Sequence, residues 1–364
     1  MGSGAAKTAE RTIFTDDFEH GLAGWRTVGD RFIRTESSSD PAHRHVLVLE
    51  PGGDVLALVR GSERWKSVRL EADVRFPANE DNYLGVVYNL QERQGRKDFG
   101  AVYVKGNGSY LQANPHHDFN PGRTLYPESR IPLEGGSAVR IGQWQRLRVE
   151  VVGRVCHLYV GDVAEPQLTF PHFEGDSGEF GFEPRSVGGP VWLDNVKVVE
   201  IEHLSYAGPP RPTHAYAPET LLTSWQVAGP LTRTEDALAE ASAPAEARWR
   251  AFPVDARGAV VTATVVDYHG PRTVAYFRTS VRAERDERAV LHVSTVDDLA
   301  LWMNGRLHAI IPRGEPAWFD FASNPAHKGQ RIPVDLRAGA NAIVLRTRGG
   351  VYASGGFFAT LERP

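Results

Sequence analysis

Short runs of alternating apolar and charged residues, separated by turns, are the feature that most limits how this chain can fold. The clearest run is Ser67–Phe76, in which four apolar residues alternate with four charged ones. A two-residue period puts one set of side chains on each face of a strand. Similar runs recur at Trp144–Val152 and Val191–Ile201, and only Glu235–Ala243 is alanine-rich enough to suggest a helix. The sequence therefore predicts an all-β protein made of sandwiches or barrels.

The length of the chain favours two domains. At 364 residues it is long for one sandwich. The Pro-rich stretch 203–224 has little periodicity and is typical of a semi-rigid linker. We expect a tag-like or disordered N-terminus over 1–11, a jelly-roll domain over 12–202, the linker, and a second β-sandwich over 225–364.

Composition excludes several classes of protein. The net charge of −4 gives no basic footprint for nucleic acid. No apolar run reaches the length of about 18 residues that a membrane-spanning helix needs. Cys156 is the only cysteine, so an intrachain disulfide is impossible and the side chain is expected to be a small buried hydrophobe. The N-terminal residues lack an apolar leader, and we expect an exported protein, extracellular or periplasmic, whose signal peptide has been removed.

The stretch Asn82–Gln112 organises the first half of the chain. It predicts three antiparallel strands, at Tyr83–Leu90, at Phe99–Val104 and near Tyr110–Gln112, with a polar turn at Gln91–Lys97. Strand alternation sorts the first two strands into two faces, and a slip of one residue would exchange them. If one face meets the core, the other points outward; the two sets are Val86, Tyr88, Val102 and Val104, and Val87, Asn89, Ala101 and Tyr103.

Polar and aromatic side chains on neighbouring predicted strands are expected to gather on one concave outer face. This set is Asn89, Tyr103, Arg148, Glu150, His157 and Tyr159. Aromatic rings and bidentate polar groups are the side chains that hold sugars. An ordinary polar sheet face, with Arg–Glu pairs across strands, is the alternative interpretation.

A polar cluster follows the organising strands at Asn114–Arg123 and forms the start of a long loop. Long loops in compact domains are often functional. His116, His117, Asp118 and Arg123 are therefore candidate ligand-binding residues, although a solvated loop would contain the same residue types. If the protein is catalytic, His157 or His117 is the expected acid–base group, with Glu150 orienting it.

Carboxylates near both ends of the first domain suggest a structural metal. Asp17 and Glu19 lie near its start and Asp194 lies in its last predicted strand. First and last strands of jelly rolls often lie side by side, and calcium binds carboxylate and carbonyl oxygens. We therefore expect a Ca²⁺ site here, with turn capping by the same side chains as the alternative.

The first domain resembles the concanavalin A-like, or laminin G-like, jelly-roll superfamily. The resemblance covers about residues 12–202 and rests on DDFE…GW, SVRLEADVRF, NYLGVVYN, WQRLRVEVVGRVCHLYVGD and GPVWLDNVKV. It is also similar to the 3-keto-glycoside hydrolase/lyase group. Family 16 glycosidases use this fold with a Glu-x-Asp-x-x-Glu strand, but here Glu71 and Asp73 are followed by Phe76, which argues against that mechanism.

The second domain resembles galactose-binding-like sandwiches. The resemblance covers about residues 225–363 and rests on SWQVAGP, YFRTSVRA, STVDDLALWMNGRLH, RIPVDLRAGANAIVLRTR and GGFFATLE. It implies a fold rather than a chemistry, because such modules either bind sugars or support a neighbouring domain.

Three functions follow from these observations. The first is recognition of an oligo- or polysaccharide on the concave face of the first domain, beneath the long loop. The second is cleavage of a glycoside on the same face. The third is a structural role in a surface assembly. The sequence leaves the sugar and the oligomeric state open.

Overall fold

The computed structural model describes residues 10–78, 82–106, 110–113, 116–117, 129–132, 139–153, 155–171, 176–186, 188–208, 220–232, 243, 245, 247–254, 258–260, 262, 265, 273–295, 298–311, 329–348 and 356–364. Within these ranges most residues are in β-strands, and the helical element whose bounds are described is the 3₁₀ turn Asp30–Phe32 (η1). The all-β prediction is confirmed. In the same ranges no helix is long and apolar enough to cross a membrane.

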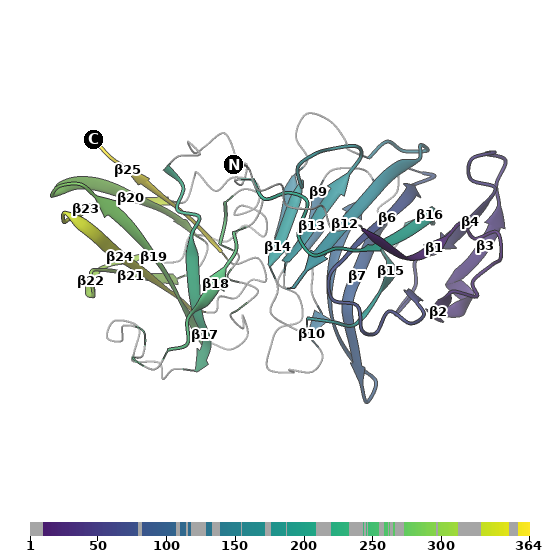
Figure 1. Ribbon diagram of the computed structural model, residues 1–364, viewed down its shortest axis with the longest axis horizontal. Coiled ribbons are helices and arrows are strands. Elements are labelled where there is room, and N and C mark those ends of the chain that lie inside the picture. Colours follow the sequence, from purple (N-terminus) through teal and green to yellow (C-terminus); the bar gives the residue numbers. More distant parts are fainter. Residues whose placement is uncertain are drawn as a thin grey trace, which may run out of the picture.

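The strands fall into two groups, which Figure 1 shows as separate lobes coloured purple to teal and green to yellow. The first group is Arg11–Asp16 (β1), Trp25–Val28 (β2), Ile33–Ser37 (β3), His45–Leu49 (β4), Leu56–Val59 (β5), Val68–Arg75 (β6), Asn82–Arg93 (β7), Arg96–Lys105 (β8), Tyr110–Ala113 (β9), His116–His117 (β10), Ser129–Pro132 (β11), Gln145–Val152 (β12), Val155–Val160 (β13), Leu168–Pro171 (β14), Glu179–Ser186 (β15) and Val191–Glu200 (β16). The second group is Trp225–Thr232 (β17), Arg250–Phe252 (β18), Thr273–Ala283 (β19), Glu287–Thr295 (β20), Asp298–Met303 (β21), Arg306–Ile311 (β22), Gly329–Leu336 (β23), Gly339–Arg348 (β24) and Phe357–Glu362 (β25).

Two antiparallel sheets form the N-terminal sandwich. Sheet A has the order β14-β13-β12-β6-β16-β4-β3, with β1 also on β16, and sheet B has the order β11-β9-β8-β7-β15-β5-β2, with β10 also on β8. The alternation of β6 explains the packing: its apolar residues are buried and its charged residues are only partly so. The apolar faces of both sheets form one core, which includes Leu70, Val86, Tyr88 and Leu193. Cys156 belongs to this core as expected, and burial raises the pKa of its thiol.

The β7–β8 hairpin is longer and tighter than the sequence suggested. The strands extend to Arg93 and resume at Arg96, so the predicted polar turn at Gln91–Lys97 is mostly strand. Gln94 and Gly95 both have positive φ, at 52° and 75°. Two such residues make the compact turn that matches the twist of paired strands. The Gly-Asn-Gly turn predicted at 106–108 and the helix predicted at Glu235–Ala243 lie almost wholly outside the described residues.

The two faces of β7 and β8, left open by the sequence, are now assigned. Val86, Tyr88, Val102 and Val104 belong to the core between the sheets. Val87, Ala101 and Tyr103 point to the other side of sheet B, where they form a second buried layer with Leu56, Leu58, Leu90 and Phe99. Part of the outward face of sheet B is thus buried as well.

The predicted single face for the sugar-binding set is wrong. Asn89 and Tyr103 lie on β7 and β8 of sheet B, whereas Arg148, Glu150, His157 and Tyr159 lie on β12 and β13 of sheet A. Their side chains leave the sandwich in opposite directions, because each set points away from the core that the two sheets share. Alternation in one strand gives the face of that strand but not the sheet to which it belongs.

The C-terminal group also forms two sheets, with the orders β18-β17-β19-β24-β21-β22 and β23-β20-β25. Their apolar faces share a separate core that contains Trp225, Phe277 and Phe357. Asn304 and Gly305, with φ of 50° and 82°, form the predicted hairpin turn. The galactose-binding-like character of this unit stays a prediction.

Candidate functional site

A row of side chains crosses the outward face of sheet B. Strand register aligns Glu183 on β15 with Gly85 on β7, Gly85 with Tyr103 on β8, and Tyr103 with Gln112 on β9. All four residues are at positions that point away from the inter-sheet core, because their neighbours Phe182, Leu84, Val102 and Leu111 point into it. Four consecutive strands therefore contribute to one line across the sheet.

Gly85 leaves the space that brings Tyr103 and Glu183 together. A Cβ atom at Gly85 would lie 2.5 Å from the Tyr103 ring and 2.9 Å from Cγ of Glu183. With no side chain there, the Tyr103 ring lies across β7 and its hydroxyl donates a hydrogen bond to Glu183. Tyr103 is fully buried and belongs to the outer apolar layer.

Glu183 is the carboxyl group of this face with the most altered acidity. Burial raises its pKa from 4.5 to about 7, against the opposing effects of the Tyr103 hydrogen bond and the Arg185 charge. The charge of Asp54 adds to the increase and that of Lys97 opposes it. The side chain is 12% exposed. A carboxyl group that is half-ionised near neutral pH is suited to proton transfer.

Arg185 and His116 complete the polar group around Glu183. Arg185 follows Glu183 by two residues on β15, so both point outward, and its guanidinium lies 5.5 Å from the centre of the Tyr103 ring and hydrogen-bonds the phenol. His116 on β10 stacks on Phe99 at 4.0 Å, and its Nε2 lies 3.9 Å from Glu183 Oε1. Burial, together with the charges of Arg185 and Lys97, lowers the pKa of His116 to about 3, which keeps the ring neutral.

Asn89 lies in a bulge of β7, where the register shifts between Tyr88 and Gln91. Its φ of 55° is left-handed. The residue is 2% exposed, and neither polar atom of its amide has a hydrogen-bond partner in the structure as described. Buried amides without partners are rare in folded proteins and often mark the place of a water or a ligand.

The predicted catalytic residues Glu150 and His157 do something else: they hold the segment that follows β16. Ser205 donates two hydrogen bonds to Glu150, from its backbone N–H at 2.9 Å and from Oγ at 2.6 Å. Tyr159 donates to the same carboxylate at 3.3 Å, and the His157 ring lies 6.5 Å from that of Tyr206. Glu150 is fully buried by this arrangement.

The remaining contacts of this cluster are also internal. The guanidinium of Arg148 stacks on Tyr159 at 3.8 Å and donates to the backbone oxygen of Val163 at 3.1 Å. Burial lowers the pKa of His157 to about 4 and raises that of Tyr159 to about 12. Glu150, His157 and Tyr159 on the outward face of sheet A are therefore buried, and Arg148 is partly exposed.

The three predicted calcium ligands each have other partners. Asp17 accepts a hydrogen bond from the backbone of Glu19 at 3.3 Å, as a turn cap does. Glu19 pairs with His45 at 3.0 Å, and Asp194 pairs with His43 at 2.9 Å. Among the described residues, no three His, Cys, Asp or Glu side chains are arranged to hold a metal ion. The Ca²⁺ site stays a prediction.

Part of the predicted loop site is outside the described residues. Asp118 and Arg123 are in that part, as is the side chain of His117, whose backbone pairs with Asp98. Of this cluster, only the side chain of His116 can be related to Glu183.

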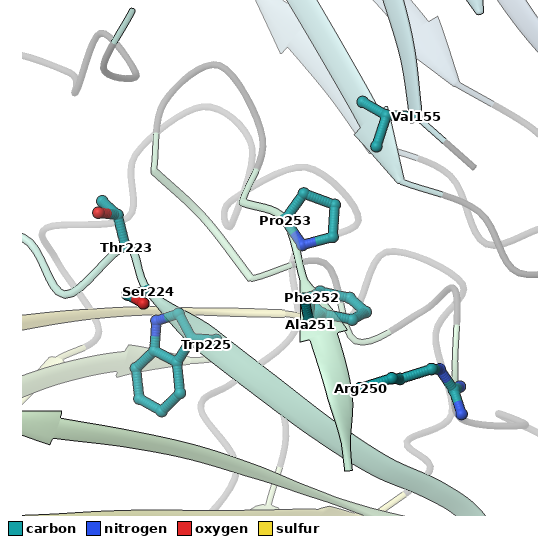
Figure 2. Close-up of a pocket in the computed structure, with 8 residues that line it drawn as sticks. All are labelled: Val155, Thr223, Ser224, Trp225, Arg250, Ala251, Phe252 and Pro253. Carbon is teal, nitrogen blue, oxygen red and sulfur yellow. The ribbon is translucent and has the colours of Figure 1, made fainter. Parts of the chain in front are cut away.

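A cleft of about 720 Å³ lies where the two lobes meet (Figure 2). Val155 at the start of β13 forms one wall. The opposite wall comes from Thr223, Ser224 and Trp225 and from Arg250–Pro253, around β17 and β18. Arg250 is its charged residue, and that guanidinium donates to the backbone oxygen of Gly229 at 2.9 Å. The cleft has fewer converging polar groups than the face of sheet B, so we favour sheet B as the functional site.

Comparisons with known proteins give distant similarities. No protein-family model and no curated protein matches the sequence. The carbohydrate-binding module CBM66 from Bacillus subtilis is similar with 13% identity and a TM-score of 0.37, over 50% of this chain and 97% of that one. A laminarinase from Rhodothermus marinus is similar with 14% identity and a TM-score of 0.37, over 53% and 98%. A Bacteroides ovatus GH16 enzyme in complex with G4G4G3G product has 10% identity and a TM-score of 0.38, over 51% and 99%. Similarities this weak do not assign a function.

Proposed function

We propose that the N-terminal sandwich binds a carbohydrate on the outward face of sheet B, around Glu183. The observation that supports this most strongly is the buried contact of Glu183 with Tyr103, on the side of the sheet that faces away from the core. Burying a carboxyl group there costs stability. A fold that needed only packing would have an apolar residue at this position.

The chemistry of the group suits a sugar. Each sugar hydroxyl donates one hydrogen bond and accepts others, and it is best held by an acceptor and a donor together. Glu183 supplies the acceptor and Arg185 the donor from the same face of one strand. His116, which stacks on the buried Phe99 and is 20% exposed, adds a ring on which the C–H face of a sugar could pack.

Two other hypotheses from the sequence lose support in their original form. Cleavage by His157 with Glu150 needs these side chains to reach a substrate, but they hold Ser205 and Tyr206. A purely structural role does not explain why the Glu183 carboxyl group and the Asn89 amide are buried. An exported location and sugar binding by the second domain remain proposals that depend on the same tests.

A thermal-shift screen against oligo- and polysaccharides tests the proposal, because a ligand that binds only the native state must raise its melting temperature. The decisive pair of variants is Tyr103→Phe and Tyr159→Phe. Each substitution removes the hydroxyl of a buried tyrosine that hydrogen-bonds a glutamate, which is Glu183 for Tyr103 and Glu150 for Tyr159. The two tyrosines lie on opposite sheets. We expect Tyr103→Phe to reduce the shift caused by an active glycan and Tyr159→Phe to leave it intact. The reverse pattern, or no shift with any carbohydrate, would refute the proposal.

A further inference from the structure

The charge next to Glu183 distinguishes between two ways of breaking a glycosidic bond. Hydrolysis passes through a transition state with positive charge on the sugar ring. Elimination next to a carboxylate or carbonyl group instead accumulates negative charge on the oxygens of that group. Arg185 points outward from the same strand as Glu183, about 7 Å along it. Its cation repels the positive charge that develops in hydrolysis and stabilises the negative charge that develops in elimination.

We propose that this site cleaves uronate-containing polysaccharides by β-elimination, with Glu183 as the acid–base group and Arg185 as the residue that binds the sugar carboxylate. The proposal rests on the carbohydrate site proposed above and adds a substrate class and a reaction to it. Arg185 suits this role because a guanidinium binds a carboxylate through two parallel hydrogen bonds.

The reaction needs no oxidant, reductant or water. The carboxylate form of Glu183 removes the proton from the carbon that bears the sugar carboxylate, and the electron pair spreads onto carboxylate oxygens held by Arg185. A C=C bond then forms as the neighbouring C–O glycosidic bond breaks. The proton on Glu183 passes to the leaving oxygen, which restores the carboxylate. The products are a new chain end bearing a hydroxyl and an unsaturated uronate.

Glu183 is better suited to this exchange than the other titratable groups that surround it. Tyr103 on β8 has its pKa raised well above 10.0 by burial, so its phenol stays protonated. His116 on β10 stays neutral and is a weak base, because its pKa is about 3. Lys97 on β8 and Asp54 before β5 act on Glu183 through their charges. Glu183, with a pKa of about 7, can both take and return a proton near neutral pH.

The test follows both possible products. Wild-type protein is incubated with polygalacturonate, alginate, and the neutral glucans laminarin and lichenan. Near-ultraviolet absorbance reports unsaturated uronate, and a reducing-sugar assay reports any cleavage. We expect absorbance and reducing ends to rise together with one of the uronate polymers, and the rate to increase with pH through about 7 as Glu183 ionises.

Two variants and a control assign the roles. Glu183→Gln is expected to bind the uronate polymer but form no unsaturated product. Arg185→Gln is expected to weaken binding of that polymer by about tenfold or more, the factor for losing a charge-assisted hydrogen bond. Glu179→Gln is the control, because Glu179 lies on the same strand and face but pairs with Arg26. It is expected to retain elimination activity.

Each other outcome overturns the proposal in a distinguishable way. Reducing ends without absorbance would mean hydrolysis, and unsaturated product from Glu183→Gln would remove that residue from the chemistry. Binding without any product, or binding of neutral glucans alone, would contradict elimination and leave the carbohydrate site standing. No shift in melting temperature with any of the four polymers would refute both.

Discussion

Replacing Glu183 by glutamine should stabilise the protein at alkaline pH and much less at acid pH. The carboxyl pKa is raised from 4.5 to about 7 in the folded state. Folding therefore favours the protonated form, whose contribution to stability is complete below pH 4.5 and is lost as pH rises through about 7. Glutamine keeps the shape and an acceptor for the Tyr103 hydroxyl but never ionises.

The size of the effect follows from this difference. Each pKa unit corresponds to about 1.4 kcal/mol, so ionising Glu183 in the folded state costs about 3 kcal/mol at pH 8 and less than about 1 kcal/mol at pH 5. For a domain of about 190 residues, 1 kcal/mol shifts the melting temperature by roughly 2–4 °C. We expect Glu183→Gln to melt about 6–12 °C above the wild type at pH 8 and no more than about 3 °C above it at pH 5.

Differential scanning calorimetry of both proteins at the two pH values measures this. His116 and His157, whose pKa values are lowered to about 3 and about 4, destabilise the fold as pH falls from 6.5. They are present in both proteins, so their effect cancels in the comparison. Glu179→Gln is the control and should be destabilised at both pH values, because it removes the carboxylate that accepts two hydrogen bonds from Arg26. An equal shift at pH 5 and pH 8, or destabilisation of Glu183→Gln at pH 8, would refute the reasoning.

Three further predictions test the surroundings of the site. Gly85→Ala should cost roughly 1–3 kcal/mol of stability through overpacking, because its Cβ would lie 2.5 Å from the Tyr103 ring. It should also abolish the glycan-induced shift in melting temperature. Gly53→Ala is the control: its Cβ would have no atom within 4 Å, so stability and the glycan-induced shift should both stay unchanged. Ser205→Ala removes the 2.6 Å hydrogen bond to Glu150 and should cost roughly 1–2 kcal/mol of stability. Limited proteolysis between the two lobes should become faster. An unchanged cleavage rate would contradict this contact. If Asp17, Glu19 and Asp194 bind calcium as the sequence predicts, EDTA should lower the melting temperature and added Ca²⁺ should restore it. An unchanged melting temperature would favour the protein partners of these carboxylates instead.

The sequence was most informative where one strand determines the outcome. Alternation in Ser67–Phe76 predicted which side chains of β6 are buried, and the burial of β6 follows that pattern. It also divided β7 and β8 into two faces and identified Tyr103 as a candidate binding residue. These are local properties of an extended chain, and a period of two is enough to find them.

The sequence could not determine which strands share a sheet. Tyr103 and His157 were expected on one face because their strands were taken as neighbours, yet β8 pairs with β7 and β9 while β13 pairs with β12 and β14. Pairing between distant segments depends on the packing of the whole domain, which no local pattern encodes. The capping of Glu150 by Ser205 is non-local in the same way, because the two residues are 55 positions apart in the sequence.

Glu183 and Arg185 were missed for a more specific reason. Pro184 disfavours the interior of a sheet, so local pattern gives no reason to continue a strand past Phe182. The structure continues β15 through Pro184, where β15 pairs with β7 only and its ladder with β5 ends at Phe182. No partner on that side needs the N–H that proline lacks. Glu183 and Arg185 lie two and four residues after Gly181. Alternation would have placed both on the outward face if the predicted strand had been extended past Pro184.

The most direct test of the central claim is a measurement of the ionisation of Glu183 itself, by NMR of a protein carrying ¹³C-labelled glutamate, with Glu183→Gln to assign the signal. We expect a carboxyl resonance that titrates near pH 7 and moves when a stabilising glycan is added. A resonance that titrates near 4.5 and ignores the glycan would mean that this face of sheet B holds neither a perturbed acid nor a binding site.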